Sequence, residues 1–367
     1  MTVACFGRER GGESWWKLVV EGEGALKSLP LHRLFCPRAG DESAVFLCEG
    51  SRPDGAAWAS ASEVPVEFFE PHPLRVPWGF PGWIDDALGW ISSHAGAISS
   101  WTELKSWCLS CVIRAETARG TVFFKATNPR PLFCNEPLVT QRLAARFPGR
   151  VPAPLAIDAG RGWLLLDDFG PCLEETDPER GSARLLGDFS SFQQQTLGRE
   201  WESELLALGC VDRRPAQLAR EVDSLLADEE SLAALADAER EKLLSMDWQA
   251  RIAAFSETPC ALVHGDLHAG NVATRAGGGL LYFDWTDASV ALPWMDLLLP
   301  SWEKNGEAAR SLLSAWSQPL PPWETIAPLI ALHHAVSYRH IRDAVEPCVR
   351  RELDRSLPHF LERAAAF

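Results

Sequence analysis

Two neighbouring segments in the C-terminal half of the chain combine acidic residues with an asparagine. They read Leu262-Val263-His264-Gly265-Asp266-Leu267-His268-Ala269-Gly270-Asn271 and Gly279-Leu280-Leu281-Tyr282-Phe283-Asp284-Trp285. Asp266 lies five residues before Asn271, and Asp284 follows thirteen residues later at the end of an apolar strand. Phosphoryl transfer needs a carboxylate that orients the attacking hydroxyl and accepts its proton, and oxygen ligands for magnesium. The spacing predicts that Asp266 is the proton acceptor and that Asn271 and Asp284 are the magnesium ligands.

The alternative interpretation is an ordinary turn followed by an ordinary strand end. A lone Asp-x4-Asn would fit that alternative. Here Gly265 and Gly270 permit tight backbone turns on either side of the segment, and an apolar strand leads into Asp284. The complete pattern therefore favours a catalytic site over a chance arrangement.

The segment from His264 to Asn271, together with Phe283-Asp284-Trp285, resembles the signature of the aminoglycoside phosphotransferase and choline kinase superfamily of small-molecule kinases. The resemblance covers about residues 80–365. It implies an α+β, protein-kinase-like fold with two lobes, a small β-rich N-lobe and a mostly helical C-lobe. It also implies ATP and Mg²⁺ as cofactors, with Asp266 as the catalytic aspartate and Asn271 and Asp284 as metal ligands. Pro293-Trp294-Met295-Asp296-Leu297 resembles a further family pattern, in which the aspartate is structural.

Such a fold requires a strand lysine facing the nucleotide phosphates and a helix glutamate that holds it. Lys125 ends the apolar run Thr121-Val122-Phe123-Phe124, and Glu136 follows eleven residues later at the start of a predicted helix. A lysine supplies a point charge for phosphate oxygens, while a carboxylate fixes its flexible stem. Lys125 and Glu136 are therefore predicted to bind the cofactor together.

Two further segments are candidates for nucleotide contacts. Leu164-Leu165-Leu166-Asp167-Asp168-Phe169-Gly170 resembles the inter-lobe hinge of the family, which assigns Leu166, Asp167 and Asp168 to the adenine edge. The chain contains no Gly-x-Gly-x-x-Gly or Walker-type loop. The phosphate-covering turn is therefore predicted at Ser106-Trp107-Cys108-Leu109-Ser110, where Ser106 and Ser110 hydroxyls and backbone amides replace glycine amides.

The pattern along the chain predicts three regions. Residues 1–75 form an accessory β-rich segment, with a faint resemblance to a degenerate Nudix-like module that lacks the glutamate-rich box. Residues 76–168 form the N-lobe, with a leading helix over 83–98, a hairpin over 111–126, a helix capped by Asn135, and strands over 154–158 and 162–167. Residues 169–367 form the helical C-lobe, with strand-like pieces over 261–285 and final helices over 324–336 and 340–365.

Composition limits the possible partners. The chain of 367 residues has a formal net charge of −15, which argues against nucleic-acid binding. It shows no apolar run long enough for a membrane span and no secretion signal, so the expected compartment is the cytoplasm. The ten cysteines are scattered, which favours buried thiols over a zinc site. The stretch Arg199–Glu257 holds fourteen acidic and seven basic residues. It forms either solvated helix faces or an acidic wall for a cationic acceptor.

The sequence therefore predicts an ATP- and magnesium-dependent phosphotransferase whose acceptor is a hydroxyl of a small, possibly cationic molecule. The alternative is a catalytically weak, nucleotide-binding pseudokinase that acts as a scaffold. The missing glycines and the extra N-terminal segment are the only support for this alternative. Activity is favoured because the sequence retains all five polar positions, namely Lys125, Glu136, Asp266, Asn271 and Asp284. A protein kinase is disfavoured by the absence of the H-R-D arginine and of an A-P-E motif. The identity of the acceptor does not follow from the sequence.

Overall fold

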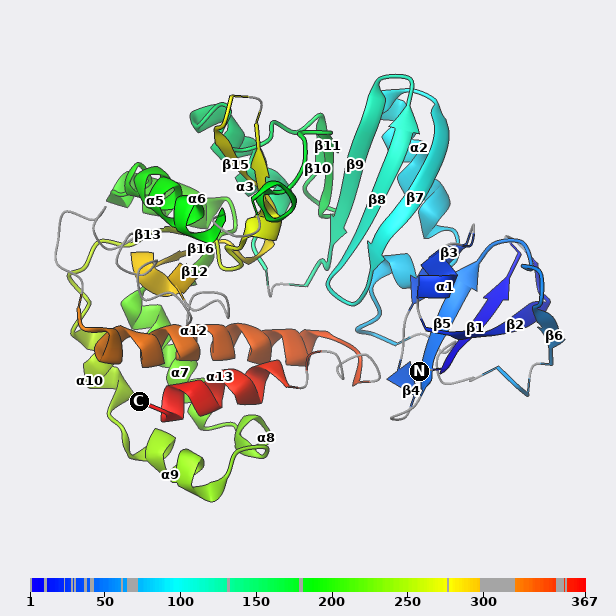
Figure 1. The fold of residues 1–367 in the computed structure, drawn as a ribbon. Helices are drawn as coiled ribbons and strands as arrows, with labels where there is room; N and C mark the ends of the chain where they lie inside the picture. Colours follow the sequence, from blue (N-terminus) through cyan, green and yellow to red (C-terminus); the bar gives the residue numbers. More distant parts are fainter. Residues whose placement is uncertain are drawn as a thin grey trace. The chain divides into compact units, whose positions relative to one another are not determined.

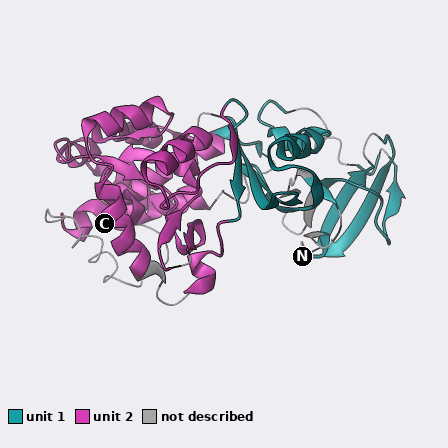
Figure 2. Ribbon diagram, turned by 90° about the horizontal axis from the view of Figure 1, so that it is seen from above, with its two compact units in different colours: residues 1–129, 160–168, 344–352 teal, residues 130–159, 169–343, 353–367 magenta. Residues whose placement is uncertain are grey.

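The computed structural model describes most of the chain, namely residues 2–9, 12–22, 24–27, 29, 31–35, 38–39, 43–60, 62–64, 72–130, 133–177, 181–275, 277–297, 321–347, 353 and 355–367. The chain divides into two compact units, which Figure 2 distinguishes by colour. Unit 1 comprises residues 1–129, 160–168 and 344–352. Unit 2 comprises residues 130–159, 169–343 and 353–367.

The N-terminal part of unit 1 is a mixed β-sheet, drawn in dark blue in Figure 1. Its strands follow the order β3-β5-β1-β2-β6, and β4 pairs with β5. Their bounds are Thr2–Arg8 (β1), Trp15–Glu21 (β2), His32–Phe35 (β3), Arg38–Ala39 (β4), Ser43–Glu49 (β5) and Ala57–Ala59 (β6), with helix α1 at Gly24–Lys27. The sheet has its own small core, which includes Val3, Trp16, Leu18 and Phe46.

The second sheet of unit 1 carries the predicted lysine strand. Its unit 1 strands follow the order β11-β9-β8-β7 and are antiparallel. Their bounds are Ile98–Ser106 (β7), Ser110–Thr117 (β8), Gly120–Thr127 (β9) and Trp163–Asp167 (β11). Side chains on β8 and β9 alternate between buried and partly exposed, as the period-2 pattern predicts. The hairpin over 111–126 is thereby confirmed.

Helix α2, Trp83–Ala95, buries one face that includes Trp83, Ile84, Ala87 and Ile91. The ring of Trp83 lies 6.1 Å from that of Phe124 on β9 and 5.9 Å from that of Trp163 on β11. This aromatic cluster packs the helix against the sheet. The predicted helix over 83–98 ends three residues early because Gly96 has φ 85°, which terminates the helix, and the chain then enters β7.

Unit 2 is mostly helical and contains the larger hydrophobic core. Its helices have the bounds Glu136–Arg146 (α3), Leu173–Thr176 (α4), Gly181–Gln194 (α5), Arg199–Ala207 (α6), Pro215–Leu226 (α7), Glu229–Leu232 (α8), Asp237–Ser245 (α9), Trp248–Ala253 (α10), Trp323–Ala344 (α12) and Ser356–Ala365 (α13). The N-cap prediction for α3 is confirmed, since the Asn135 side chain accepts from the Leu138 amide at 3.5 Å.

The end of the chain differs from the prediction. One long helix, α12, continues to Ala344, where two helices over 324–336 and 340–365 were expected, and the last helix begins only at Ser356. The residues between the two expected helices, Ser337 to Arg339, include neither glycine nor proline, so nothing interrupts the backbone hydrogen bonds there. Pro328 is accommodated inside this helix, near its beginning.

Short strands in unit 2 place the two motif segments. One small sheet has the order β12-β16-β13, with the bounds Val211–Arg213 (β12), Ala261–Val263 (β13) and Ser289–Ala291 (β16). A separate hairpin pairs β14, Val272–Thr274, with β15, Leu280–Tyr282. Strand β10, Ala156–Asp158, also belongs to unit 2. The strand-like pieces predicted over 261–285 are therefore present.

Among the described residues, no helix combines the length and the apolar character needed to cross a membrane. The described cysteines form no disulfide, and all but the half-buried Cys172 are buried, as the scattered spacing predicted.

Candidate active site

The first motif segment begins where strand β13 ends and is held by a buried aspartate. The backbone amides of His264 and Gly265 donate to the two carboxylate oxygens of Asp296, at 3.0 and 2.8 Å. The His264 ring donates from Nε2 to the carbonyl oxygen of Phe283 at 2.9 Å. Since Phe283 precedes Asp284, this histidine joins the two motif segments.

Gly265 meets two requirements that exclude other residues. Its φ is +84°, in the left-handed region, and a Cβ placed there would lie 2.4 Å from the carbonyl oxygen of Asp287. No side chain can occupy that space without moving the backbone. The glycine thereby lets the loop before Asp266 approach the loop after Asp284.

Asp266 is fixed by the other end of its own motif. The Nδ2 group of Asn271 donates to the carbonyl oxygen of Asp266 at 2.9 Å and to its Oδ2 at 3.1 Å. The Nε2 atom of His268 lies 3.7 Å from the same Asp266 oxygen, Oδ2. The five-residue spacing thus closes a small loop that orients the carboxylate.

The protonation states follow from these contacts. Burial alone would raise the pKa of Asp266, but its interaction with His268 outweighs burial and lowers the pKa below its usual value. The same interaction raises the pKa of His268. Asp266 is therefore ionised at neutral pH and can accept a proton.

Asp284 is brought to Asn271 by the β14–β15 hairpin. In that hairpin Val272 pairs with Tyr282, and just beyond it the Phe283 amide donates to the carbonyl oxygen of Asn271 at 3.1 Å. Asp284 itself has φ 63°, and it is the only non-glycine residue with positive φ in the part of the chain that the structure describes. A left-handed aspartate at the end of a strand is a strained conformation of the kind found at functional sites.

A threonine that the sequence did not single out connects the metal-ligand candidate to the helix glutamate. The Thr286 hydroxyl lies 2.9 Å from Asp284 Oδ1 and 2.9 Å from Glu136 Oε2. Glu136 opens α3 and is only 1% exposed. The backbone adds a further tie, because the Cys134 amide donates to the Thr286 carbonyl at 3.1 Å. No pattern in the sequence indicates Thr286, which lies two residues after the recognised motif.

Asp296 has the structural role that its motif implied. It is fully buried, and burial raises its pKa to about 7 despite the two amide donors. Beside it, the ring of His334 on α12 is hydrogen-bonded to the Met295 backbone, and burial lowers the pKa of this histidine to about 4. The long helix α12 thereby supports Asp296, which anchors residues 264–271, the proposed catalytic loop.

The remaining predicted residues belong to unit 1. Lys125 is half-buried on β9, where it pairs with Val112 on one side and Leu164 on the other. Glu136 lies in unit 2, so a Lys125–Glu136 contact stays a prediction. Ser106 is buried and its hydroxyl donates to the Arg33 carbonyl at 2.8 Å. The Ser110 hydroxyl accepts from the Trp107 ring at 2.9 Å. Both serines therefore make protein contacts, and their phosphate role also stays a prediction.

The predicted hinge comprises the last two residues of β11 and Asp168. Leu166 is buried and pairs with Phe123, whereas the Asp167 carboxylate is exposed and pairs with Arg119 at 3.0 Å. The Asp168 amide donates to the Thr121 carbonyl at 3.2 Å. The adenine contacts expected of these residues are untested.

A magnesium ion would have two protein ligands here. Among the described residues, no cluster of three or more His, Cys, Asp or Glu side chains is placed to hold a metal. Asn271 turns its Nδ2 toward Asp266, which directs the amide oxygen elsewhere, and Asp284 adds a carboxylate. One carboxylate and one amide oxygen suit magnesium, which commonly takes its other ligands from phosphates and water. The residues present fit the ion.

Comparison with solved structures relates the fold to known kinases. The choline kinase LicA from Streptococcus pneumoniae superposes with a TM-score of 0.56 at 14% identity, over 77% of this chain and 99% of that one. A GDP and kanamycin complex of APH(2")-IIIa gives 0.55 at 14% identity, over 77% and 98%. Spectinomycin phosphotransferase APH(9)-Ia, solved with ADP and spectinomycin, gives 0.51 at 12% identity, over 77% and 97%. No curated protein matches the sequence.

These likenesses confirm the predicted α+β, protein-kinase-like fold. The family profile described as "Phosphotransferase enzyme family" matches residues 115–336, which contain the lysine strand, the helix glutamate and both motif segments. The match spans more than half of the chain. The protein therefore belongs to the phosphotransferase enzyme family.

Proposed function

We propose that this phosphotransferase moves the γ-phosphoryl group of ATP to a hydroxyl group of a small molecule. The observation that carries the proposal is the arrangement around Asp266. Its carboxylate is oriented by Asn271 at 3.1 Å, and the next hydrogen bond along joins Asn271 to the residue before Asp284. A proton acceptor and two magnesium ligands are thus parts of one hydrogen-bonded unit.

In the proposed reaction, Asp266 accepts the proton of the acceptor hydroxyl as its oxygen attacks the γ-phosphorus and the bond to the leaving ADP breaks. The lowered pKa of Asp266 keeps the carboxylate ready for that proton. Asn271 and Asp284 would hold magnesium, which neutralises charge on the phosphate oxygens when bound. Lys125 would add a positive charge near the phosphates, and Glu136 would orient it. Most of the rate enhancement would come from positioning.

The acceptor is proposed to be a small alcohol, and an amine-bearing alcohol or sugar is preferred. The solved relatives include a choline kinase and enzymes complexed with kanamycin or spectinomycin. The charges that support the preference lie close to the catalytic loop. Asp266 and Asp287 both contribute, after burial, to the raised pKa of Tyr338 on α12, so both carboxylates act on that part of the helix. A cationic acceptor would be attracted to the same carboxylates.

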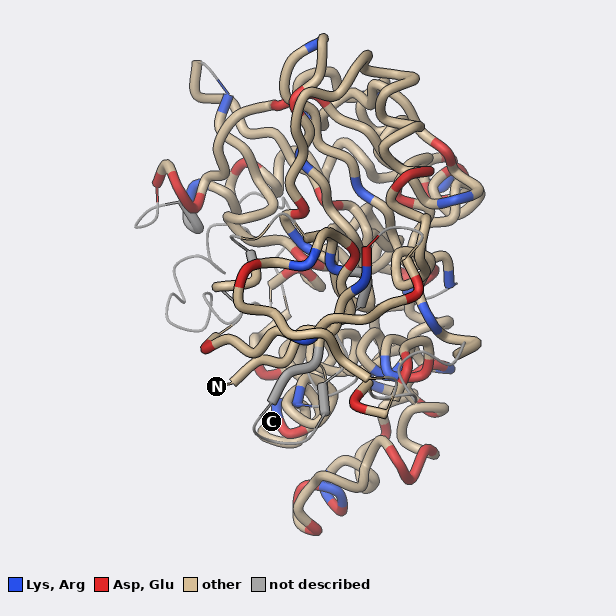
Figure 3. Tube along the Cα trace, turned by 90° about the vertical axis from the view of Figure 1, so that its right-hand side faces the viewer, with Lys and Arg blue, Asp and Glu red and all other residues tan. Residues whose placement is uncertain are grey.

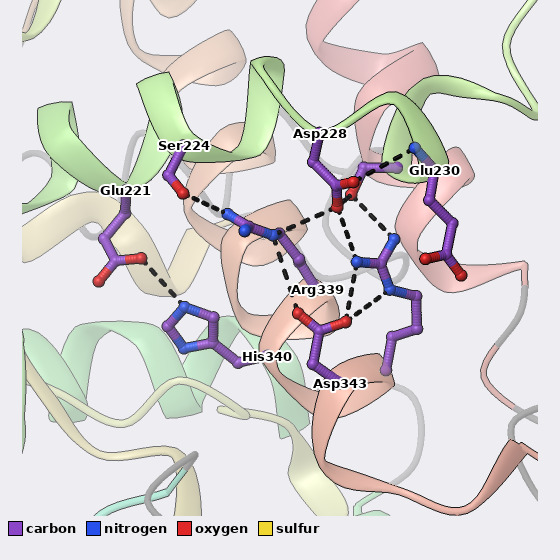
Figure 4. A network of polar contacts seen from close by, with 9 residues as sticks. Glu221, Ser224, Asp228, Glu230, Arg339, His340 and Asp343 are labelled. Atoms are coloured by element: carbon purple, nitrogen blue, oxygen red, sulfur yellow. Dashed lines mark hydrogen bonds and ion pairs between the residues drawn. The ribbon is translucent and has the colours of Figure 1, made fainter.

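The acidic stretch 199–257 offers less unpaired charge than its composition implies. Asp228 pairs with Arg339 at 3.4 Å, as Figure 4 shows, and with Arg342 at 2.7 Å. Asp212 pairs with Arg214 at 2.8 Å. Along the chain, acidic and basic residues lie interspersed (Figure 3). The cationic preference is therefore attributed to the catalytic loops first and to this stretch second.

The function is tested by ATP turnover on a panel of amino alcohols, sugars, aminoglycosides and neutral or anionic alcohols, each at low and high salt. We expect turnover with at least one cationic alcohol, and its KM should rise with salt because screening weakens the attraction. Turnover limited to neutral or anionic acceptors would contradict the cationic preference alone. A phosphorylated amine or acid instead of an alcohol would contradict the proposed acceptor group.

The magnesium ligands are tested separately by titrating nucleotide affinity with Mg²⁺. Asp284→Ala should weaken magnesium-dependent ATP binding more than Asn271→Ala, because Asp284 brings the charge. Lys125→Met should impair turnover severely without lowering the melting temperature. If Asp284→Ala binds Mg-ATP as tightly as the wild type, the metal assignment is wrong. Nucleotide binding without turnover on any panel member would favour the pseudokinase.

A further inference from the structure

We propose that unit 1 carries a second binding site, separate from the phosphotransfer machinery, for a small amphiphilic carboxylate. The site is a cavity of about 560 Å³ between strand β7 and the segment that leads into β3. This volume lies within the range of small-molecule sites in proteins. The cavity wall is formed on one side by Leu26, Leu29 and Leu31, and on the other by Ser99 to Glu103.

The cavity exists because two sheet edges meet without pairing. β3 is the edge strand of the N-terminal sheet and β7 is the edge strand of the second sheet. Exposed edges are usually covered, because their backbone groups otherwise lack partners. Here two side chains of β7 bind the backbone of Arg33. The Arg33 amide donates to Glu103 at 3.1 Å, and the Arg33 carbonyl accepts from the Ser106 hydroxyl at 2.8 Å. These contacts fix one end of the junction, and Ser99 to Thr102 line the cavity at the other.

The charge at the fixed end favours an anion. Among the described residues, Glu103 is the one carboxylate that lines the cavity, and its side chain is 8% exposed. It already accepts from the Arg33 amide at 3.1 Å and from the Arg33 Nε at 3.2 Å. The His32 Nδ1 lies 2.8 Å from the same carboxylate, and the His32 side chain is fully buried. A ligand cation would therefore compete with groups that are already in place. Arg33 is paired with Glu103 through its Nε, but a guanidinium has five N–H donors, so it can bind an anion in addition to this carboxylate.

The polar groups along β7 extend this preference. Ser100 and Thr102 line the cavity, are exposed and carry hydroxyl groups, while the Ser99 hydroxyl donates to the Glu116 carbonyl at 3.2 Å. A hydroxyl can donate to a carboxylate oxygen, and a hydrogen bond to an ionised group is about twice as strong as a neutral one. The wall thus offers donors that suit a carboxylate head.

The opposite wall suits an apolar tail. Leu26 is buried in the core of the N-terminal sheet, and Leu29 and Leu31 pack partly buried against that core. The ring of Trp101 also lines the cavity and lies 5.8 Å from the ring of His32. A short alkyl or aryl chain would bury apolar surface against these side chains. A head that accepts hydrogen bonds and an apolar tail together define the proposed ligand class.

The experiment is calorimetric titration of the full chain with octanoate, octanol and octylamine, which share one tail and differ in the head group. Octanoate should bind saturably at one site and roughly tenfold or more tighter than the other two, since a charge-assisted hydrogen bond separates them. No saturable binding of octanoate, or equal binding of octylamine, would overturn the proposal. No nucleotide is present, so the result is independent of the proposed function.

Variants locate the binding. Ser100→Phe should fill the cavity and abolish octanoate binding, while Leu104→Phe, on the same strand but outside the cavity wall, should leave it unchanged. Arg33→Gln should bring octanoate affinity close to that of octanol, and Arg33→Lys should restore much of the difference. The melting temperature of each variant shows whether it folds. If Ser100→Phe does not fold, the proposal is tested by comparing the octanoate affinities of Arg33→Lys and Arg33→Gln. Unchanged binding in Ser100→Phe, or an equal loss in both arginine variants, would contradict the assignment.

Discussion

Two aspartates of unit 2, Asp296 and Asp228, both accept hydrogen bonds, but their pKa values are shifted in opposite directions. Asp296 is fully buried beneath the catalytic loop, its partners include two backbone amides, and its pKa is raised to about 7 by burial. Asp228 is half-buried between α7 and α8 and contacts Arg339 (Figure 4). It also contacts Arg342. Burial there is outweighed by a bond from Ser231 and by Arg342, so its pKa falls to about 2.

The difference shows that the catalytic loop is anchored without a cation. Amide donors fix the direction of the Asp296 carboxylate and, through it, the backbone before Asp266. A salt bridge would bring positive charge close to the catalytic carboxylate and lower its basicity further. The surface network carries no such constraint, and arginines there hold α12 to α7 and α8. The contributions of Asp296 and Asp228 to stability should therefore respond in opposite directions to pH.

The largest effect is expected for Asp266→Asn. The asparagine retains the shape and the bond from Asn271 but cannot accept the proton, so turnover should fall by about 10²–10⁴-fold. Nucleotide affinity and melting temperature should change little, because the side chain acts on the acceptor. Steady-state kinetics and nucleotide titration measure both. Turnover near that of the wild type would show that Asp266 is not the base.

The next largest effect is expected for Asp296→Asn. The amide has one oxygen for two backbone donors, so the free energy of unfolding should fall by about 1–3 kcal/mol. In the wild type the folded state holds a proton on Asp296 up to about pH 7, whereas the unfolded chain releases it near pH 4. The contribution of Asp296 to the free energy of unfolding is therefore complete at low pH, and it is lost as the pH rises toward about 7.

Denaturant unfolding at about pH 5 and pH 7 tests that sign. The difference in unfolding free energy between the wild type and Asp296→Asn should be smaller at the higher pH. A difference that is equal at both values, or larger at pH 7, would mean that Asp296 is ionised throughout and that the amide bonds outweigh burial.

A smaller effect is expected for Thr286→Val, which keeps the shape but removes the hydroxyl shared by Asp284 and Glu136. Loss of one hydrogen bond beside two carboxylates should lower the free energy of unfolding by about 1–2 kcal/mol and weaken Mg-ATP binding severalfold. Thr286→Ser is the matched control and should behave like the wild type. If both variants lose affinity equally, packing by the threonine methyl group is responsible instead.

The smallest effect is expected for Asp228→Asn, at about 1 kcal/mol, because the network is partly exposed and salt screens it. Its folded pKa is below the unfolded value, so its contribution is present above about pH 4 and is lost as the pH falls toward 2. Asp223→Asn, exposed on α7, is the control and should change stability by less than about 0.5 kcal/mol. Equal losses in the two variants would show that the network adds nothing.

Much of the fold could be predicted from local chemistry. The β8–β9 hairpin follows from alternation around a turn, and α3 begins where Asn135 can cap it. Strand β7 was not predicted, because its edge position leaves most of its side chains partly or fully exposed and removes the alternation. The break expected in α12 was wrong because the residues Ser337 to Arg339, which suggested a loop, are also compatible with a helix.

The site divides in a similar way. Residues whose chemistry is unusual, such as Asp266, Asn271 and Asp284, could be found from their spacing. Thr286 could not, because a threonine near a strand end is common and its role depends on Glu136, which is 150 residues away in the chain. The cavity of unit 1 arises from the meeting of two sheet edges, which periodicity along one strand does not reveal.

The left-handed backbone at Asp284 has a consequence for protein engineering. A glycine adopts φ 63° without strain, so Asp284→Gly should relieve roughly 1 kcal/mol of conformational energy while deleting a proposed metal ligand. A library selected for heat resistance alone would therefore enrich glycine at this position and yield robust but inactive proteins. Selection that also requires turnover would retain the aspartate, and the frequency of glycine in the two libraries would measure how much stability this enzyme gives up for function.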